Sequence, residues 1–192
     1  MAYLHLRLSS VSRAKGANAI EWAACYAATA LHDPGSGRTY DYSNLTDVAY
    51  REIIGPSEAG EWWQDRQVLW QAAEGVELRR NACVAREWQL GLPYELSFLQ
   101  RIELARRWAI FVVTRYGCAV DLTVHTPPPD GDPRNHYAKL LATTRQVNVA
   151  SLGDKTSIEK RYGEKSGPQE LRLLHQLWRQ MVDEILQGTV AA

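Results

Sequence analysis

Hydrophobic and polar positions repeat along the chain with two different periods. Leu4, Leu6 and Leu8 alternate with more polar residues, a pattern typical of a strand with one buried face. From about residue 18 to residue 31, the apolar positions instead recur at the three-to-four-residue spacing of an amphipathic helix. The same two periods interleave over the rest of the sequence, which predicts a domain that contains both strands and helices.

Most of the remaining elements can be predicted in the same way. Further strands are expected at 38–42, 48–54, 83–92, 119–126 and 138–144, and further helices at 58–78, 96–115 and 168–186. Residues 9–16 and 148–167 are polar and are expected to form loops. The strands at 119–126 and 138–144 follow each other across a short loop, which favours antiparallel pairing. The predicted fold class is therefore α+β, a central antiparallel sheet with helices packed on one face.

Composition indicates an ordinary soluble globular protein. The chain has 192 residues, 45% of them hydrophobic and 23% charged, which fits one domain over 1–192. No apolar run is long enough to span a membrane, and the N-terminus lacks the pattern of a signal peptide. The three cysteines form no CxxC pair, so reduced thiols in the cytoplasm are expected. The formal net charge is zero and does not by itself suggest a nucleic-acid partner.

The most informative stretch is Val120 to His125, followed by a loop and by Arg134 to Arg145. It resembles the metal-site motif of the MobA/MobL relaxases, which belong to the HUH endonuclease superfamily. In that family one histidine ends a strand and two more lie on the next strand. Here His125 stands at the first ligand position, whereas Tyr137 and Lys139 stand at the other two.

This substitution bears directly on metal binding. In the family, three neutral imidazoles on one sheet face hold a divalent metal, Mg²⁺ or Mn²⁺, with positions left open for catalysis. Residues two apart on a strand share a face, so Tyr137 and Lys139 are expected to face His125, whereas His136 points to the opposite side. An ammonium group is only a donor and repels a cation. Metal binding is therefore expected to be weak or absent here.

The resemblance extends over nearly the whole chain. It includes Ser12 to Gly16, Asp33 to Tyr42 and Ala85 to Pro93. It implies a palm-like sheet with an open face and assigns the nucleophile to Tyr26. Such a tyrosine attacks a phosphodiester of single-stranded DNA and forms a covalent 5′-phosphotyrosyl link. Without the resemblance, Tyr26 reads as a core aromatic.

Other residues at family positions have two interpretations each. Glu87 either acts as a catalytic base or holds a histidine through a hydrogen bond; otherwise it is a solvated carboxylate or a partner of Arg79 or Arg86. Asp121 either orients His125 as an outer-shell partner of the metal site or neutralises Lys139. Lys139 is expected to turn toward Asp121 or Glu87, or toward a phosphate when DNA is bound. Basic residues near family motifs are candidates for DNA contacts, although each one is also an ordinary surface charge: Arg13, Lys15, Arg79, Arg86 and Arg145.

The resemblance implies a relaxase for plasmid mobilisation, an endonuclease and strand transferase. Its partner is then single-stranded or hairpin DNA at an origin of transfer, together with other relaxosome proteins. The alternative is a sequence-specific DNA-binding module that has lost nicking. Relatives commonly continue into helicase-like or primase-like regions, so the chain is also consistent with the N-terminal part of a longer protein.

Overall fold

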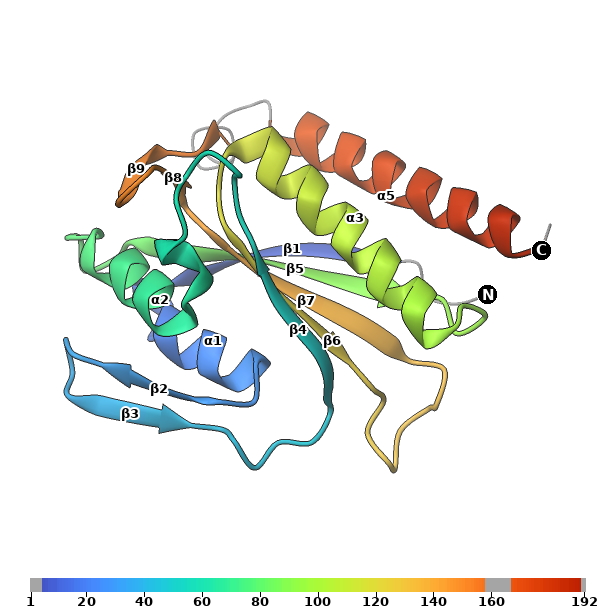
Figure 1. Ribbon diagram of the computed structural model, residues 1–192, viewed down its shortest axis with the longest axis horizontal. Coiled ribbons are helices and arrows are strands. Elements are labelled where there is room, and N and C mark those ends of the chain that lie inside the picture. The colour runs from blue at the N-terminus through green and yellow to red at the C-terminus, as the bar shows by residue number, and fades with distance from the viewer. Residues whose placement is uncertain (1–4, 158–166, 191–192) are drawn as a thin grey trace.

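A five-stranded antiparallel sheet forms the centre of the domain in the computed structural model, which describes residues 5–157 and 167–190. Its strands, in spatial order, are β1 (Leu6–Ser12), β5 (Cys83–Leu92), β7 (His136–Thr143), β6 (Val120–His125) and β4 (Val48–Ile54). Every neighbouring pair is antiparallel, including β6 and β7. The predicted α+β class with a central antiparallel sheet is confirmed (Figure 1).

Two long helices cover one face of this sheet. They are α3 (Phe98–Tyr116) and α5 (Gly167–Val190), which lie side by side in Figure 1. Trp88 on β5, Trp108 on α3 and Trp178 on α5 are each at most 1% exposed and join the two layers. Burial of such large side chains is the main favourable contribution to folding.

The other face is covered at one end by α1 (Ala19–Tyr26) and α2 (Arg66–Gly75), and these helices enclose a second hydrophobic cluster. The prediction of helices on one face thus holds for α3 and α5, whereas α1 and α2 pack on the opposite side. Two small hairpins complete the described part: β2 (Ala30–Asp33) with β3 (Arg38–Asp41), and β8 (Arg145–Val147) with β9 (Leu152–Lys155).

Two predicted helices differ from the observed ones. The helix expected at 18–31 ends at Tyr26, because Ala28 adopts a left-handed φ of 47° and β2 then begins. The helix expected at 58–78 is divided into a short 3₁₀ turn (Trp62–Gln64) and α2. The division falls at Asp65, whose side chain accepts the Val68 N–H and caps α2.

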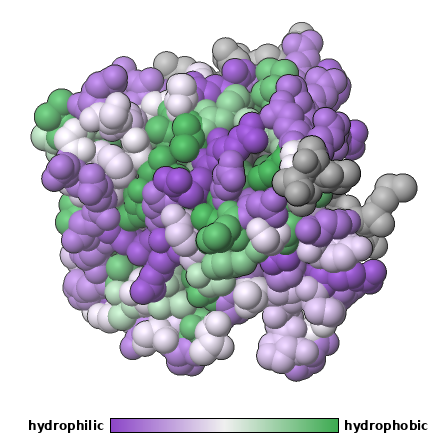
Figure 2. Space-filling model, turned by 45° about the vertical axis from the view of Figure 1, so that its right-hand side comes forward, coloured by the Kyte–Doolittle hydropathy of each residue, from purple (hydrophilic) through white to green (hydrophobic). Residues whose placement is uncertain are grey.

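Two predicted loops also contain regular structure. In 9–16, β1 continues to Ser12 and is followed by a 3₁₀ turn (Arg13–Lys15). The segment 148–167 contains β9 (Leu152–Lys155), and its residues 158–166 lie outside the described part. No described helix is long and apolar enough to cross a membrane. On the surface seen in Figure 2, hydrophilic residues are interspersed with smaller hydrophobic areas.

Candidate active site

Strand register brings four polar side chains onto the sheet face that α1 approaches. His125 pairs with Tyr137 and Thr123 pairs with Lys139 across β6 and β7. On the other side of β7, Leu141 pairs with Glu87 of β5. Because side chains alternate between faces, Glu87, His125, Tyr137 and Lys139 share one face. The predicted register of β6 and β7 is confirmed.

Helix α1 places Tyr26 over this face. Its N-terminus is capped by Asn18, and its buried alanines, which include Ala23 and Ala24, belong to the hydrophobic cluster that also contains residues of the sheet. At the other end, the Arg51 guanidinium donates to the Ala27 carbonyl oxygen at 2.7 Å. The last residue of the helix, Tyr26, is consequently held with only 8% of its surface exposed.

Glu87 accepts hydrogen bonds from two hydroxyl groups. Tyr26 Oη donates to Glu87 Oε1 at 2.5 Å, and Ser9 Oγ donates to Glu87 Oε2 at 2.6 Å. Burial, and then the hydrogen bond to Glu87, raise the pKa of Tyr26 well above its usual value. The phenol therefore stays protonated at rest, with a carboxylate in position to accept its proton. This is the geometry of a nucleophile beside its general base.

Lys139 lies against the same tyrosine. Its Nζ is 3.8 Å from the centroid of the Tyr26 ring, the arrangement of a cation–π contact. Burial lowers the pKa of Lys139, and the charges of Glu87, Cys25 and Asp47 act in the opposite direction. The site thus contains a half-buried ammonium group next to the candidate nucleophile.

His125 is held by neighbours on three sides. Its Nδ1 lies 3.0 Å from Asp47 Oδ2, its Nε2 lies 2.9 Å from Thr123 Oγ1, and its ring stacks on Tyr137 at 4.8 Å between centroids. Burial lowers the pKa of His125, while Asp47 acts to raise it. The imidazole is fixed in orientation by these contacts.

Asp121 neither orients His125 nor neutralises Lys139, the two roles expected for it. Its carboxylate accepts hydrogen bonds from Arg66 at 2.7 and 2.8 Å and from Trp70 Nε1 at 3.0 Å. Asp47 is the acid that contacts His125, and Lys139 turns to Tyr26 rather than to Asp121. Asp121 is a buried ion-pair partner that fastens α2 to the sheet.

The donor set around His125 does not fit the three-imidazole metal site of the family. Within residues 5–157 and 167–190, no group of three histidine, cysteine, aspartate or glutamate side chains is arranged to hold a metal ion. Both ring nitrogens of His125 already have partners, and Lys139 contributes a positive charge where a metal ligand is needed.

The candidate DNA contacts fall into three groups. Arg13 and Arg145 bind carboxylates within the protein, those of Glu74 and Glu77. Arg86 is 5% exposed and lies on the sheet face covered by α3, two residues from Trp88, so the proposal that it contacts DNA is incorrect for this structure. Lys15 and Arg79 are exposed.

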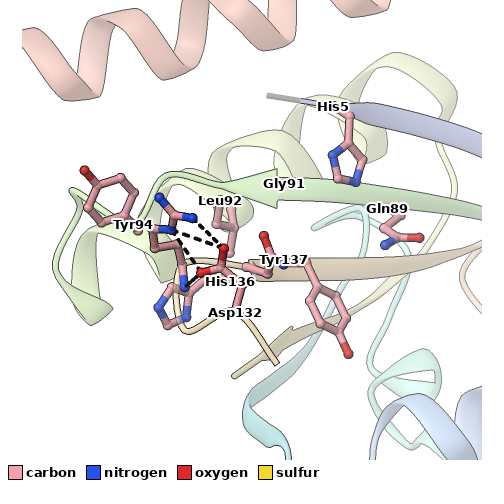
Figure 3. A pocket seen from close by; sticks show the side chains of 10 residues that line it. His5, Gln89, Gly91, Leu92, Tyr94, Asp132, His136 and Tyr137 are labelled. Atoms are coloured by element: carbon pink, nitrogen blue, oxygen red, sulfur yellow. Dashed lines mark hydrogen bonds and ion pairs between the residues drawn. The ribbon is translucent and has the colours of Figure 1, made fainter. Parts of the chain in front are cut away.

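A pocket of about 420 Å³ adjoins the site at Tyr137. Tyr137, Gln89 and His5 lie toward one end of it and Tyr94 toward the other, as Figure 3 shows. Asp132, which Figure 3 shows between these ends, forms an ion pair with Arg134. Aromatic rings and hydrogen-bonding groups therefore line a pocket that meets the candidate site at Tyr137.

Several functional contacts were not evident from the sequence. Asp47 lies just before β4 and meets His125 only because β4 pairs with β6. Ser9 reaches Glu87 through the pairing of β1 with β5. In both cases strand pairing between distant segments makes the contact, and no local motif marks either residue.

The sheet, the helix that carries Tyr26 and the adjacent Glu87 together define a relaxase-like domain. The chain belongs to the MobA/MobL family, whose family model matches residues 17–188. It is 28% identical over 195 residues to the conjugal transfer protein TraA of Rhizobium radiobacter, covering 96% of this chain and 17% of that protein. It is 35% identical over 127 residues to the mobilization protein MobL of Acidithiobacillus ferridurans, covering 66% of this chain and 33% of that protein. The chain thus spans a third or less of these curated relatives.

Solved structures agree with this assignment. A structure described as the molecular basis of vancomycin resistance transfer in Staphylococcus aureus superimposes with a TM-score of 0.79 at 29% identity, over 96% of this chain and 93% of that one. The conjugative relaxase TrwC, in a metal-bound complex with oriT DNA, superimposes with a TM-score of 0.61 at 13% identity, over 96% and 70% of the two chains. The likeness to TrwC shows the fold alone.

Proposed function

We propose that this domain binds single-stranded DNA at an origin of transfer and cleaves and rejoins one strand through Tyr26. The observation that carries this proposal is the 2.5 Å hydrogen bond from Tyr26 Oη to the buried Glu87 carboxylate, on the open sheet face of a MobA/MobL domain. Because the relatives are much longer, the domain acts in this proposal as the DNA-cleaving part of a larger mobilisation protein.

The reaction is a transesterification. Tyr26 transfers its proton to Glu87 as Oη attacks the phosphorus atom, and the bond from phosphorus to the 3′ oxygen breaks. The 5′ phosphate remains on the tyrosine, the leaving 3′ oxygen takes a proton from water, and the proton that Glu87 then releases to solvent neutralises the resulting hydroxide. The reverse reaction, with a 3′ hydroxyl as the attacking group, rejoins the strand.

The pocket beside Tyr137 supports the proposal, because unpaired bases stack well on aromatic rings and hydrogen-bond to polar groups. In this view the strand passes from the pocket, near Tyr94 and Gln89, to the phosphate position beside Tyr26. Lys15 and Arg79 remain candidates for weaker phosphate contacts outside the site.

Covalent capture tests this function. Single-stranded oligonucleotides tiled across the replicon that encodes the chain, each labelled at its 3′ end, are mixed with protein in Mg²⁺ and Mn²⁺ and resolved under denaturing conditions. We expect a labelled adduct with the wild type and with the control Tyr42→Phe, whose hydroxyl contacts Glu21 away from the sheet face. Tyr26→Phe should form none.

The alternative, a DNA-binding module without cleavage, draws on the departure of Tyr137 and Lys139 from the family ligands. It predicts that wild type and Tyr26→Phe bind the same oligonucleotide equally and that neither forms an adduct. A Tyr26→Phe protein that still forms the adduct would refute the assignment of the nucleophile.

A further inference from the structure

The ammonium group of Lys139 occupies an unusual environment. It is half-buried between β5 and β6, its pairing neighbours being Gln89 and Thr123, and its Nζ rests on the Tyr26 ring. In the described part of the chain it forms no direct ion pair, and the carboxylates of Glu87 and Asp47 act on it only from a longer distance. Partial burial of a charge without an ion-pair partner is unfavourable, so this arrangement suits a site that receives an anion from outside.

The position of this charge matches the needs of the proposed reaction. A phosphodiester attacked by Tyr26 Oη must lie beside the tyrosine ring, where Lys139 already stands. Lysine binds phosphate as a compact point charge, and a positive charge fixed before the reaction stabilises the negative charge that develops on the phosphoryl oxygens. The same position on β7 is one of the family's two metal-ligand positions on this strand.

We propose that Lys139 is a built-in cation that binds a non-bridging oxygen of the scissile phosphate, so that DNA cleavage by this domain needs no divalent metal. The proposal rests on the proposed function of the Tyr26 site. Lys139 keeps its proton throughout: the proton of Tyr26 goes to Glu87, and the leaving 3′ oxygen is protonated by water.

The first experiment measures the rate of adduct formation on the tiled oligonucleotides with EDTA and with Mg²⁺ or Mn²⁺. For the wild type we expect rates that agree within about twofold in all three conditions. Lys139→Gln should lower the rate on the order of 10²- to 10³-fold, as the loss of one preorganised electrostatic group does. Lys139→Arg, which keeps the charge, should recover part of that loss.

The double variant Tyr137→His with Lys139→His tests whether cleavage becomes metal-dependent when the lysine is replaced. It restores the family's ligand types on the His125 face, so any adduct that it forms should require metal. A wild-type adduct that disappears in EDTA and returns with Mn²⁺ would overturn the role of Lys139 while leaving Tyr26 chemistry in place.

A binding measurement distinguishes the two proposals if no adduct forms at all. In the Tyr26→Phe background, Lys139→Gln should weaken binding of an oligonucleotide from the set and reduce the slope of log K against log salt by about 0.7, the value for one phosphate contact on single-stranded DNA. The control Arg179→Gln removes an exposed charge from α5 and should leave that slope unchanged. Equal slopes for Lys139→Gln and its parent would refute the phosphate contact.

Discussion

At the scale of single residues, Glu87 is the group on which the proposed chemistry depends most. It accepts the hydroxyls of both Tyr26 and Ser9. Glu87→Gln keeps the volume and the hydrogen-bonding oxygen but cannot take a proton at neutral pH, so adduct formation should slow by about 10²- to 10⁴-fold. Single-turnover kinetics on the cleaved oligonucleotide measure this change.

Ser9→Ala serves as the matched control for Glu87→Gln. It removes the second hydroxyl that contacts the carboxylate and leaves the path from Tyr26 to Glu87 intact. A much smaller effect on the rate is therefore expected. If Glu87→Gln retained a rate within twofold of the wild type, Glu87 could not be the base.

Arg66 and Asp121 make a different kind of contribution, to stability. Asp121 is 3% exposed and is bound by both the Arg66 guanidinium and Trp70. Arg66→Met leaves that carboxylate buried without its cation, which should cost about 3 to 5 kcal/mol in the free energy of unfolding. Urea denaturation measures the loss. Arg134→Gln breaks an exposed pair with Asp132 and should change the stability little.

At the scale of elements, Glu77 ties the β8–β9 hairpin to the chain segment that follows α2. Its carboxylate binds Arg145 at 2.7 Å and Lys155 at 2.6 Å. Burial alone raises the pKa of Glu77, but the hydrogen bonds from Lys155 and Arg145 outweigh burial and bring it below the ordinary 4.5. A lowered pKa in the folded state means stability that is present above the unfolded-state pKa and is lost as pH falls through the folded-state pKa.

Glu77→Gln should therefore destabilise the protein at pH 7 by about 1 to 3 kcal/mol, the range for hydrogen bonds to charged groups. The difference from the wild type should shrink as pH falls below about 4.5, where the carboxylate becomes protonated first in the unfolded state and then, at its lower pKa, in the folded state. Urea unfolding at several pH values tests this. The exposed pair of Glu184 with Arg107 provides the control, and Glu184→Gln should have little effect at any pH. A difference that stayed constant from pH 7 to pH 3 would contradict the linkage.

The end of α1 offers a test of backbone strain. Ala28 has a φ of 47°, a conformation that costs an alanine roughly 1 to 2 kcal/mol and costs glycine little. Ala28→Gly should therefore stabilise the fold by up to about 1 kcal/mol in urea denaturation. Ala27→Gly, one residue earlier at a φ of −89°, should destabilise it. Loss of stability in both variants would show that Ala28 is not strained.

These elements also show what the sequence could and could not predict. The sheet strands were predictable because they alternate or run apolar between turn residues, as at 48–54 and 83–92. The early end of α1 was not, since alanine gives no signal for a left-handed conformation at residue 28. The cap at Asp65 was also missed, because the apolar spacing continues across the break.

At the scale of the whole molecule, the motif on β6 and β7 and the family resemblance identified the site face, with Tyr26, Glu87, His125 and Lys139 on it. Contacts that arise from the pairing of strands distant in the sequence could not be predicted from local sequence patterns. For this reason Asp121 was predicted to contact His125, whereas the acid that contacts it in the structure is Asp47. Arg86 was assigned to the DNA-contacting surface wrongly because all residues from 84 to 88 are buried, so the polar side chains of this strand do not mark its open face.

Mass spectrometry of the covalent adduct is the decisive test of whether Tyr26 carries the DNA strand during transfer. After digestion with nuclease and protease, the peptide that contains Tyr26 should carry a nucleotide through its 5′ phosphate. Recovery of that peptide unmodified from a purified adduct, with the nucleotide attached to another residue such as Tyr137, would show that Tyr26 is not the nucleophile.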